Sequence, residues 1–242
     1  MPAHAPSRST RTGWENPGEI PAYFIYEAAR YLRLPPRTVR DWVLGRSYPT
    51  GKGRRDWPPL IQPADPRGEL LSFLNLVELH VIASVRRAPH QVQPKAVRYA
   101  INYLRKAFDS KHPLLDQQML TDGKGLFIER YGEMVEISSD GQMHLKKFMD
   151  AYLKRIEWDE SHIPIRLYPF TRKPTTEESP QYVVIDPRIR SGKPCISGTG
   201  VTTSIVDERY RAGDSVDSLA ADYGRSREEI EDAIRYESRT AA

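Results

Sequence analysis

The stretch "YFIYEAARYLRLPPRTVRDWVLG", residues 23–45, contains two short amphipathic segments separated by a turn. Pro36 can open the second segment as a helix, because proline suits the first helical position. Apolar residues recur at helical spacing and would point inward at Ile25, Ala28, Ala29, Leu32, Val39, Trp42 and Val43. The pattern predicts a helix, a turn at 33–35 and a second helix.

The outer face of the second predicted helix is polar and mostly basic. It would display Arg37, Arg40, Asp41 and Leu44, with Thr38 near its start. A helix-turn-helix that reads DNA has this layout, since its second helix faces the base edges. An ordinary helical hairpin with a solvated basic face has the same pattern, so this segment alone leaves both interpretations open.

The next stretch, "GRSYPTGKGRRDWPPLI" at residues 45–61, has turn residues around a basic tip. It predicts a wing, a hairpin whose Lys52, Arg54 and Arg55 can lie along phosphates, with Arg46 at its start. Two amphipathic helices follow at about 71–85 and 94–108, the second opened by Pro94.

This order of elements resembles the N-terminal half of MerR-type regulators. The residues "AARYLRLPPRTVRDW", 28–42, correspond to the usual opening of that family, although the wing here is proline-rich and lacks the common Tyr-rich pattern. The resemblance implies a winged DNA-binding module over 22–110. Residues 1–21 lack apolar periodicity and are expected to be a flexible tail.

The middle region, 111–173, has a different pattern from the helical segments before it. The short strand-like runs "DQQML", "LFIER" and "MVEIS", separated by the turn residues "TDGKG" and "YGE", predict a small antiparallel meander from 116 to 138. A helix is expected after it, because apolar residues recur at helical spacing at Leu145, Phe148, Met149, Tyr152, Leu153 and Ile156. Polar residues at 174–180 predict a linker.

The stretch "VVIDPRIRSGKPCISGTG", 183–200, combines basic residues with glycines as a phosphate-binding loop would. A Walker-type loop needs Ser or Thr after its Gly-Lys, whereas Lys193 is followed by Pro194, which also removes a backbone donor. No histidine is placed near Cys195 to activate it as a nucleophile. The stretch is therefore interpreted as a rigid turn.

Three helices are predicted after this turn, in "SIVDERYR" at 204–211, "SVDSLAADYG" at 215–224 and "SREEIEDAIRYE" at 226–237. Ser226 and Glu229 have the spacing of a capping box. The segment 181–242 thus predicts a second helix-turn-helix behind a strand and two turns. Its last helix carries Glu228, Glu229, Glu231, Asp232 and Glu237, which would repel phosphates, so we expect it to contact a protein chain or water rather than DNA.

The turn and the three helices are similar to a widespread bacterial domain whose members usually read Asp-Pro, Gly-Lys-Pro, Ile and Gly-Thr before a three-helix unit. Members commonly carry a basic residue after Gly-Thr, where this chain has Gly200. Together with the MerR-like module, the arrangement resembles VapB-like antitoxins. That resemblance implies a mainly α fold with small antiparallel β elements, binding to the protein's own operator, and neutralisation of a PIN-like ribonuclease toxin.

Charged residues are distributed unevenly along the chain. Residues 1–110 hold 17 Lys or Arg against 9 Asp or Glu, whereas residues 176–242 hold 9 against 13. The basic end is expected to meet a polyanion. No apolar run approaches the roughly 18 residues of a membrane span, and no secretory signal is recognisable, so we expect a cytoplasmic protein. With one cysteine and no ligand spacing among six histidines, we expect no metal, no cofactor and no catalytic residue.

These observations lead to a hypothesis with defined sites. Base edges and phosphates would be contacted by Arg37, Thr38, Arg40, Arg46, Lys52, Arg54 and Arg55. The toxin's acidic active site would be contacted by Arg188, Arg190 and Lys193. The competing interpretation is that these three merely solvate a structural turn or touch operator phosphates. A homodimer is expected, with the helix at 94–108 as candidate interface. The alternative is a stand-alone MerR-like transcription regulator that senses a ligand and has no toxin partner.

Overall fold

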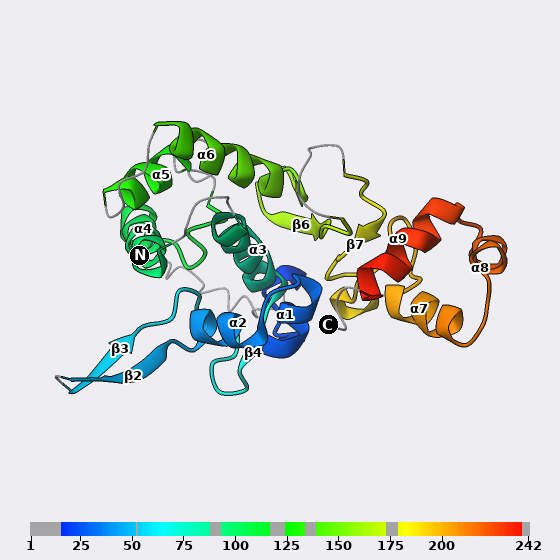
Figure 1. Ribbon diagram of the computed structural model, residues 1–242, viewed down its shortest axis with the longest axis horizontal. Helices are drawn as coiled ribbons and strands as arrows, with labels where there is room; N and C mark the ends of the chain where they lie inside the picture. The colour runs from blue at the N-terminus through cyan, green and yellow to red at the C-terminus, as the bar shows by residue number, and fades with distance from the viewer. Residues whose placement is uncertain are drawn as a thin grey trace, which may run out of the picture.

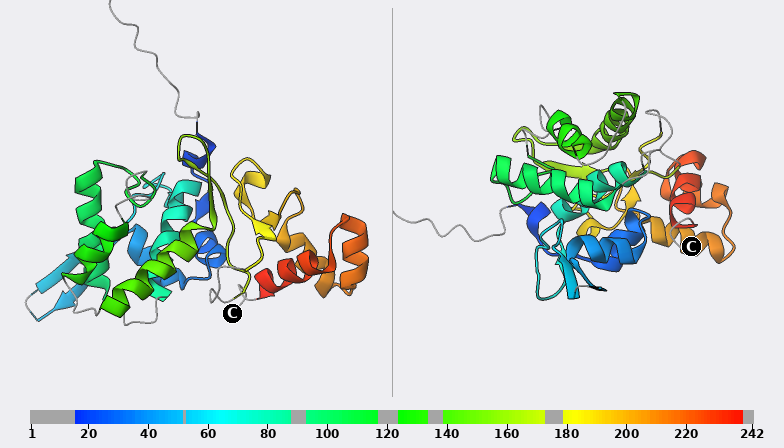
Figure 2. Two further views of the ribbon diagram at one scale, coloured as in Figure 1. Left: turned by 90° about the horizontal axis from the view of Figure 1, so that it is seen from above. Right: turned by 60° about the vertical axis from the view of Figure 1, so that its left-hand side comes forward.

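The computed structural model describes residues 16–51, 53–87, 93–116, 124–133, 139–172 and 179–238. These residues form a mainly helical protein with small antiparallel sheets, as expected from the sequence. A body built from the chain up to β6 occupies most of the molecule, and the last three helices form one end of it (Figures 1 and 2).

The first helical pair consists of α1 (Ile25–Tyr31) and α2 (Pro36–Val43), which pack against each other. Six of the seven residues expected to point inward are buried, and Trp42 is half-buried. Strand β1 (Tyr23–Phe24), just before α1, pairs antiparallel with β4 (Leu70–Leu71). This pairing ties the entrance of α1 to the chain that leads into α3.

The hairpin predicted after α2 is present as β2 (Arg46–Thr50) and β3 (Gly53–Trp57), with Arg46 opposite Trp57. Gly45, between α2 and β2, has φ +76, and a Cβ there would lie 2.5 Å from the carbonyl oxygen of Trp57. Only glycine fits this sharp turn without strain. The hairpin projects from the body beside α2 (Figure 1).

The main core is built around α3 (Phe73–Arg87), in which the residues from Phe73 to Val85 are buried. Helices α4 (Pro94–Phe108), α5 (Lys124–Gly132) and α6 (Ser139–Leu153) complete the body, with α4 on α5 and α6 on both α3 and α5. The core positions expected in α6 are confirmed. Leu145, Met149, Tyr152 and Leu153 are buried, and Phe148 packs against the core. Buried apolar residues on both sides of position 110 share this one core.

The strand expected in "LFIER" is wrong, since these residues lie inside α5. Phe127, Ile128 and Tyr131 are buried, which is the i, i+1, i+4 spacing of one helix face. A segment of five residues is too short to distinguish the helical period from the strand period, and packing against α4 and α6 decided between them. Of the other two expected strands, "MVEIS" and all of "DQQML" except Asp116 lie outside the described residues.

The expected flexible tail is also corrected in part, because residues 16–21 are placed against the body. A 3-10 helix, η1 (Pro17–Glu19), is capped by the side chain of Asn16, which accepts from the Gly18 amide at 2.9 Å. Gly18 is buried beside Leu74. This contact and the charge of Glu19 hold the segment, and neither is visible as a hydrophobic period in the sequence.

Beyond α6 the chain is extended in β5 (Ile156–Trp158) and β6 (Pro164–Leu167), an antiparallel pair. Ile156, expected on the face of α6, therefore lies in a strand, and it is buried. The buried guanidinium of Arg155 donates to the carbonyls of Tyr168, Pro169, Ser179 and Pro180. It thus joins both ends of the linker, most of which lies outside the described residues.

The C-terminal unit has β7 (Val183–Val184) paired with β8 (Cys195–Ile196), and a 3-10 turn, η3 (Arg190–Gly192), between them. The three expected helices are confirmed as α7 (Thr203–Arg211), α8 (Val216–Tyr223) and α9 (Arg227–Ser238). Ser215 caps α8, Gly224 ends it at φ +60, and Ser226 and Glu229 form the capping box. A second core is centred on Ile196, Val206, Leu219, Ile230 and Ala233.

Candidate nucleic-acid interface

Helix α2 forms a ridge with Arg37 at its crest. Successive helical residues are about 100° apart, so the buried Val39 and Val43 place Arg37 on the opposite, exposed side. Thr38 and Asp41 descend from the crest on one flank, and Arg40 descends on the other. A groove of about 640 Å³ runs along each flank, and Arg37 lines both grooves.

The groove toward the β2–β3 hairpin, here called the hairpin-side groove, has basic walls and an aromatic base. Arg46 lies 3.6 Å from Asp41 and stacks over the ring of Tyr48, with its guanidinium carbon 5.6 Å from the ring centroid. Arg98 of α4 lies over the Trp57 ring and donates to the backbone carbonyl of Pro58. These contacts anchor the base of the hairpin to the helical body.

The groove on the other flank, here called the loop-side groove, lies between α2 and the turn before β4. Its walls carry Phe24, Tyr26, Arg37, Arg40, Arg67 and Glu69. Arg40 is paired with Glu69 at 3.1 Å, and both side chains are largely exposed. Arg40 therefore has an acidic partner that the sequence did not predict.

The other predicted DNA contacts lie on the hairpin. Arg54 donates to the Ser47 hydroxyl at 3.2 Å, Arg55 is exposed, and Lys52 lies outside the described residues. Sequence reasoning missed Arg67 and Arg86, which line the two grooves. The "DPRG" turn around Arg67 was a visible signal, whereas Arg86 belongs to α3 and meets the residues of α2 only where the folded chain forms the groove.

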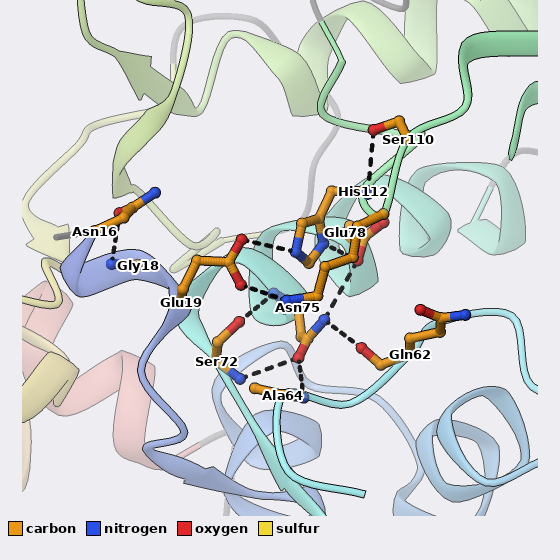
Figure 3. A network of polar contacts seen from close by, with 11 residues as sticks. Asn16, Gly18, Glu19, Gln62, Ala64, Ser72, Asn75, Glu78, Ser110 and His112 are labelled. Carbon is orange, nitrogen blue, oxygen red and sulfur yellow. Dashed lines mark hydrogen bonds and ion pairs between the residues drawn. The ribbon is translucent and has the colours of Figure 1, made fainter. Parts of the chain in front are cut away.

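A buried polar network fixes the turn before β4 to α3 (Figure 3). The Asn75 side-chain oxygen accepts from the amides of Ala64 and Ser72, at 3.0 and 3.1 Å, and its nitrogen donates to the Gln62 carbonyl at 2.9 Å. Asn75 is fully buried, so these bonds are shielded from water. Both stems of the turn are thereby held by one side chain.

The same network continues to the N-terminal segment through His112. Its Nδ1 lies 2.8 Å from Glu78, and its Nε2 lies 3.2 Å from Glu19, which also pairs with Lys111 at 2.8 Å. Burial disfavours the imidazolium, but the bonds to Glu19 and Glu78 outweigh it and raise the pKa of His112 to about 9. The bond to His112, more than its partial burial, lowers the pKa of Glu19 to about 2. The network therefore holds charged groups in place inside the fold.

The turn at 186–200 places the three predicted toxin contacts differently. Arg188 is paired with the buried Asp186 at 3.2 Å, and Arg190 donates to the Gly200 carbonyl at 2.9 Å, while Lys193 is exposed. Burial opposes the Asp186 carboxylate, but bonds from Arg188 and Arg166 outweigh it and hold its pKa below the usual value. Both arginines thus help to shape the turn as well as presenting charge.

Cys195 lies under this turn and is 1% exposed. Burial raises the pKa of its thiol to about 11, so the thiol is protonated near neutral pH. Within the described ranges, no group of three or more His, Cys, Asp or Glu residues could hold a metal ion. No helix in that part of the chain is long and apolar enough to cross a membrane.

The last turn of α9 docks on the C-terminal end of α1. The Tyr236 hydroxyl donates to the Tyr31 carbonyl at 2.9 Å, Arg33 lies over the Tyr236 ring at 5.2 Å, and Glu237 pairs with Arg30. Glu237 and Asp232, expected on a surface that faces water or a partner chain, are buried. Asp232 accepts instead from Thr171 at 2.8 Å and pairs with Arg172 and Arg235.

Helix α4 is the candidate dimer interface, and its apolar face packs within the subunit. Ala96, Val97, Ala100, Ile101 and Leu104 are all buried in the main core. The surface that α4 leaves exposed includes Lys95, Tyr99 and Lys106.

Comparison with known proteins gives two kinds of similarity. The family described as "Protein of unknown function (DUF433)" matches residues 183–236, which span β7 to α9. The curated Mycobacterium tuberculosis protein "Putative antitoxin VapB45" is 29% identical over 239 residues, covering 89% of this chain and 93% of that protein. "Uncharacterized protein Rv2308" of the same organism is 25% identical and covers 88% of this chain and 89% of its own length.

A solved structure is similar along nearly the whole fold. The "X-ray crystal structure of Rv2018 from Mycobacterium tuberculosis" superposes with a TM-score of 0.63 at 26% identity, covering 89% of this chain and 98% of the other. The chain is therefore similar over most of its length to a protein described as "Putative antitoxin VapB45", and its overall fold is similar to that of a solved structure.

Proposed function

We propose that this protein is the DNA-binding antitoxin of a type II toxin-antitoxin module. It binds its own operator, represses its own operon and neutralises a PIN-like ribonuclease toxin. The antitoxin role is supported by the similarity to "Putative antitoxin VapB45" along 89% of the chain. The DNA-binding role rests on one observation, the exposed Arg37 at the crest of α2 between two basic grooves.

The major groove of duplex DNA is about 12 Å wide and admits one α-helix, so α2 would be the element that enters it. Arg37 would then reach base edges, while Arg46, Arg54 and Arg55 of the hairpin would lie along a phosphate strand. Lys52 would add to the same basic tip. Thr38 would contact a base edge or phosphate beside Arg37.

The test is binding to a labelled duplex from immediately upstream of the gene, measured by fluorescence anisotropy at matched salt. The double variant Arg37→Ala with Arg40→Ala is expected to bind at least about 30-fold more weakly, since each arginine contact contributes roughly 1–3 kcal/mol. Lys147→Ala, an exposed change on α6, serves as control. Equal affinity of the double variant and the parent would contradict the assignment of the reading helix.

The toxin contact is proposed at the turn of 186–200. A PIN-like active site gathers carboxylates, and an exposed cation on a rigid turn can compete for them at low entropic cost. All three candidate side chains are exposed, and Arg188 and Arg190 are held at fixed positions by Asp186 and the Gly200 carbonyl.

This contact is tested with Arg188, Arg190 and Lys193 all changed to Ala. Cells that express the neighbouring toxin should lose growth rescue, while operator binding and the far-ultraviolet circular dichroism spectrum stay those of the parent. Undiminished rescue would remove this surface from the proposal. Because Arg188 also pairs with Asp186, Lys193→Ala alone provides a second variant that leaves the turn's own bonds intact.

The stand-alone regulator is distinguished by the gene neighbourhood and by co-purification. Capture of the adjacent reading frame's product on the tagged protein supports the antitoxin. A neighbouring frame that encodes no PIN-like protein, combined with intact operator binding, supports the regulator instead.

A further inference from the structure

We infer that the loop at 64–70, with the aromatic pair Phe24 and Tyr26, is a second contact for the DNA backbone, on the flank of α2 opposite the hairpin. The inference rests on the proposed DNA-binding function and adds a surface to it. The loop projects from the body beside α2, as the hairpin does (Figure 1).

The loop has a fixed shape. Asp65 and Leu70 exchange backbone hydrogen bonds of 3.0 Å in both directions, and the Asp65 side chain accepts from the Arg67 amide at 3.0 Å. Its two stems are held by the buried Asn75, as Figure 3 shows. A loop already held in its binding shape loses little conformational entropy when it meets a partner.

The aromatic pair is unusually exposed for its size. Phe24 and Tyr26 are 50% and 60% exposed, and their rings stack with centroids 5.6 Å apart and planes within 13°. They flank the loop-side groove, and neither ring belongs to the buried core. Two stacked, exposed rings beside a basic groove offer a contact surface, and on a duplex they would pack against the deoxyribose of the backbone.

The groove beside Phe24 and Tyr26 carries more positive than negative side chains, which favours an anionic partner. Arg37, Arg40 and Arg67 line the groove against the single carboxylate of Glu69. The pair of Arg40 with Glu69 is exposed, at 59% and 45%, so it contributes little stability and can be exchanged for a phosphate. A guanidinium fork facing a phosphate next to an aromatic face matches one sugar-phosphate unit.

Continuity with α2 favours DNA over a protein partner. Arg37 lines both grooves, so a duplex whose major groove receives the crest would carry one strand's backbone past the hairpin and the other past the loop. The hairpin and the loop would then grip the duplex from both flanks of α2.

Three variants separate the parts of this surface, each measured by anisotropy over a salt series on the upstream duplex. Phe24→Ala with Tyr26→Ala should weaken binding about 10-fold with an unchanged salt slope, because an apolar contact releases no counterions. Arg67→Ala should lower the slope by about 1, the loss of one phosphate contact. Glu69→Gln should tighten binding about 3-fold, because it removes a carboxylate and frees Arg40.

The matched controls are Tyr210→Ala, an exposed aromatic on α7, and Lys147→Ala, an exposed cation on α6, both expected to bind like the parent. Circular dichroism verifies folding, and Arg67→Ala, at an exposed loop tip, keeps the test valid if the aromatic variant fails to fold. If the parent does not bind the duplex, the proposed function itself fails.

If the parent binds and all three variants match it, this second contact is overturned. Variants that bind DNA normally but lose growth rescue against the toxin would also overturn it, because the surface would then meet a protein.

Discussion

At the scale of single residues, His112 connects three parts of the chain that are distant in sequence. Its imidazole lies between Glu19 of the N-terminal segment and the buried Glu78 of α3, and Lys111 is the nearby cation. Because the folded pKa of about 9 is above the ordinary 6.5, the charged form stabilises the fold fully below pH 6.5. That contribution is lost as the pH rises through 9.

The prediction is that the unfolding free energy falls by about 2–3 kcal/mol between pH 6.5 and 9, as a shift of this size implies. His112→Gln should be less stable at pH 6.5 and should show little of this decline. Urea unfolding at a series of pH values measures both, with His144→Gln as the control on an exposed histidine. Parallel curves for parent and His112→Gln would show that the imidazolium contributes nothing.

Gly192 is a second residue whose identity follows from one contact. It has φ +73, and a Cβ would lie 1.8 Å from the Tyr23 hydroxyl, so the glycine of the Gly-Lys-Pro motif packs on the strand before α1. Gly198 has nearly the same backbone angle, φ +75, but nothing within 4 Å of its Cβ position. Comparing the same substitution at Gly192 and Gly198 therefore separates the effect of a steric clash from that of backbone strain.

We expect Gly192→Ala to lower the unfolding free energy by about 2–4 kcal/mol, and Gly198→Ala by only about 1 kcal/mol. Adding Tyr23→Phe, which removes the clashing oxygen, should recover part of the loss at position 192. Thermal or urea unfolding gives the comparison. Similar losses at both glycines would mean that Tyr23 does not press on Gly192 in solution.

At the scale of elements, the α1–α2 turn is held from two directions. Arg87 of α3 donates to the carbonyls of Leu32 and Arg33 at 2.8 Å, and Tyr236 of α9 donates to the carbonyl of Tyr31. Helix α9 therefore helps to position the helical pair to which we assign DNA reading. The sequence predicted that the carboxylates of α9 face a partner chain or water, but some of them form ion pairs and hydrogen bonds within the subunit.

Tyr236→Phe should cost about 1 kcal/mol of stability, because the ring stays and the buried carbonyl loses its donor. Amide hydrogen exchange should accelerate at the α1–α2 turn more than in α8. Tyr210→Phe, which alters an exposed hydroxyl on α7, is the matched control. Unchanged exchange at the turn would show that α9 docks without restraining it.

At the scale of the whole molecule, the basic and acidic ends of the sequence are not independent units. The C-terminal helices have their own small core, but α9 and the Gly-Lys-Pro turn pack on β1 and α1. A partner bound to the C-terminal helices would therefore be connected to the α1–α2 turn through the contacts of α9 with α1.

We keep the expectation of a homodimer on DNA, because one winged reader contacts few base pairs and two copies double the phosphate contacts. Since the apolar face of α4 packs inside the subunit, a dimer would have to use another surface. Sedimentation velocity at micromolar concentration, with and without the upstream duplex, measures the stoichiometry. A monomer in both conditions would contradict this expectation.

The sequence by itself determined the elements whose signals are local. Apolar periodicity located α1, α2, α3, α4 and α6, glycines and basic residues located the hairpin, and the Ser226–Glu229 spacing located the start of α9. These signals lie within one or two turns of the chain, so they can be read without knowing what packs nearby.

Tertiary structure decided the rest, because those features depend on partners far away in sequence. "LFIER" became helix α5 because α4 and α6 cover one face of it, and residues 16–21 became ordered because Glu19 meets His112. Arg67 and the pair of Arg40 with Glu69 entered the candidate site only when the loop at 64–70 folded beside α2. Burial of α9's carboxylates likewise required Arg30 and Thr171, which lie in other elements, so no local pattern could reveal it.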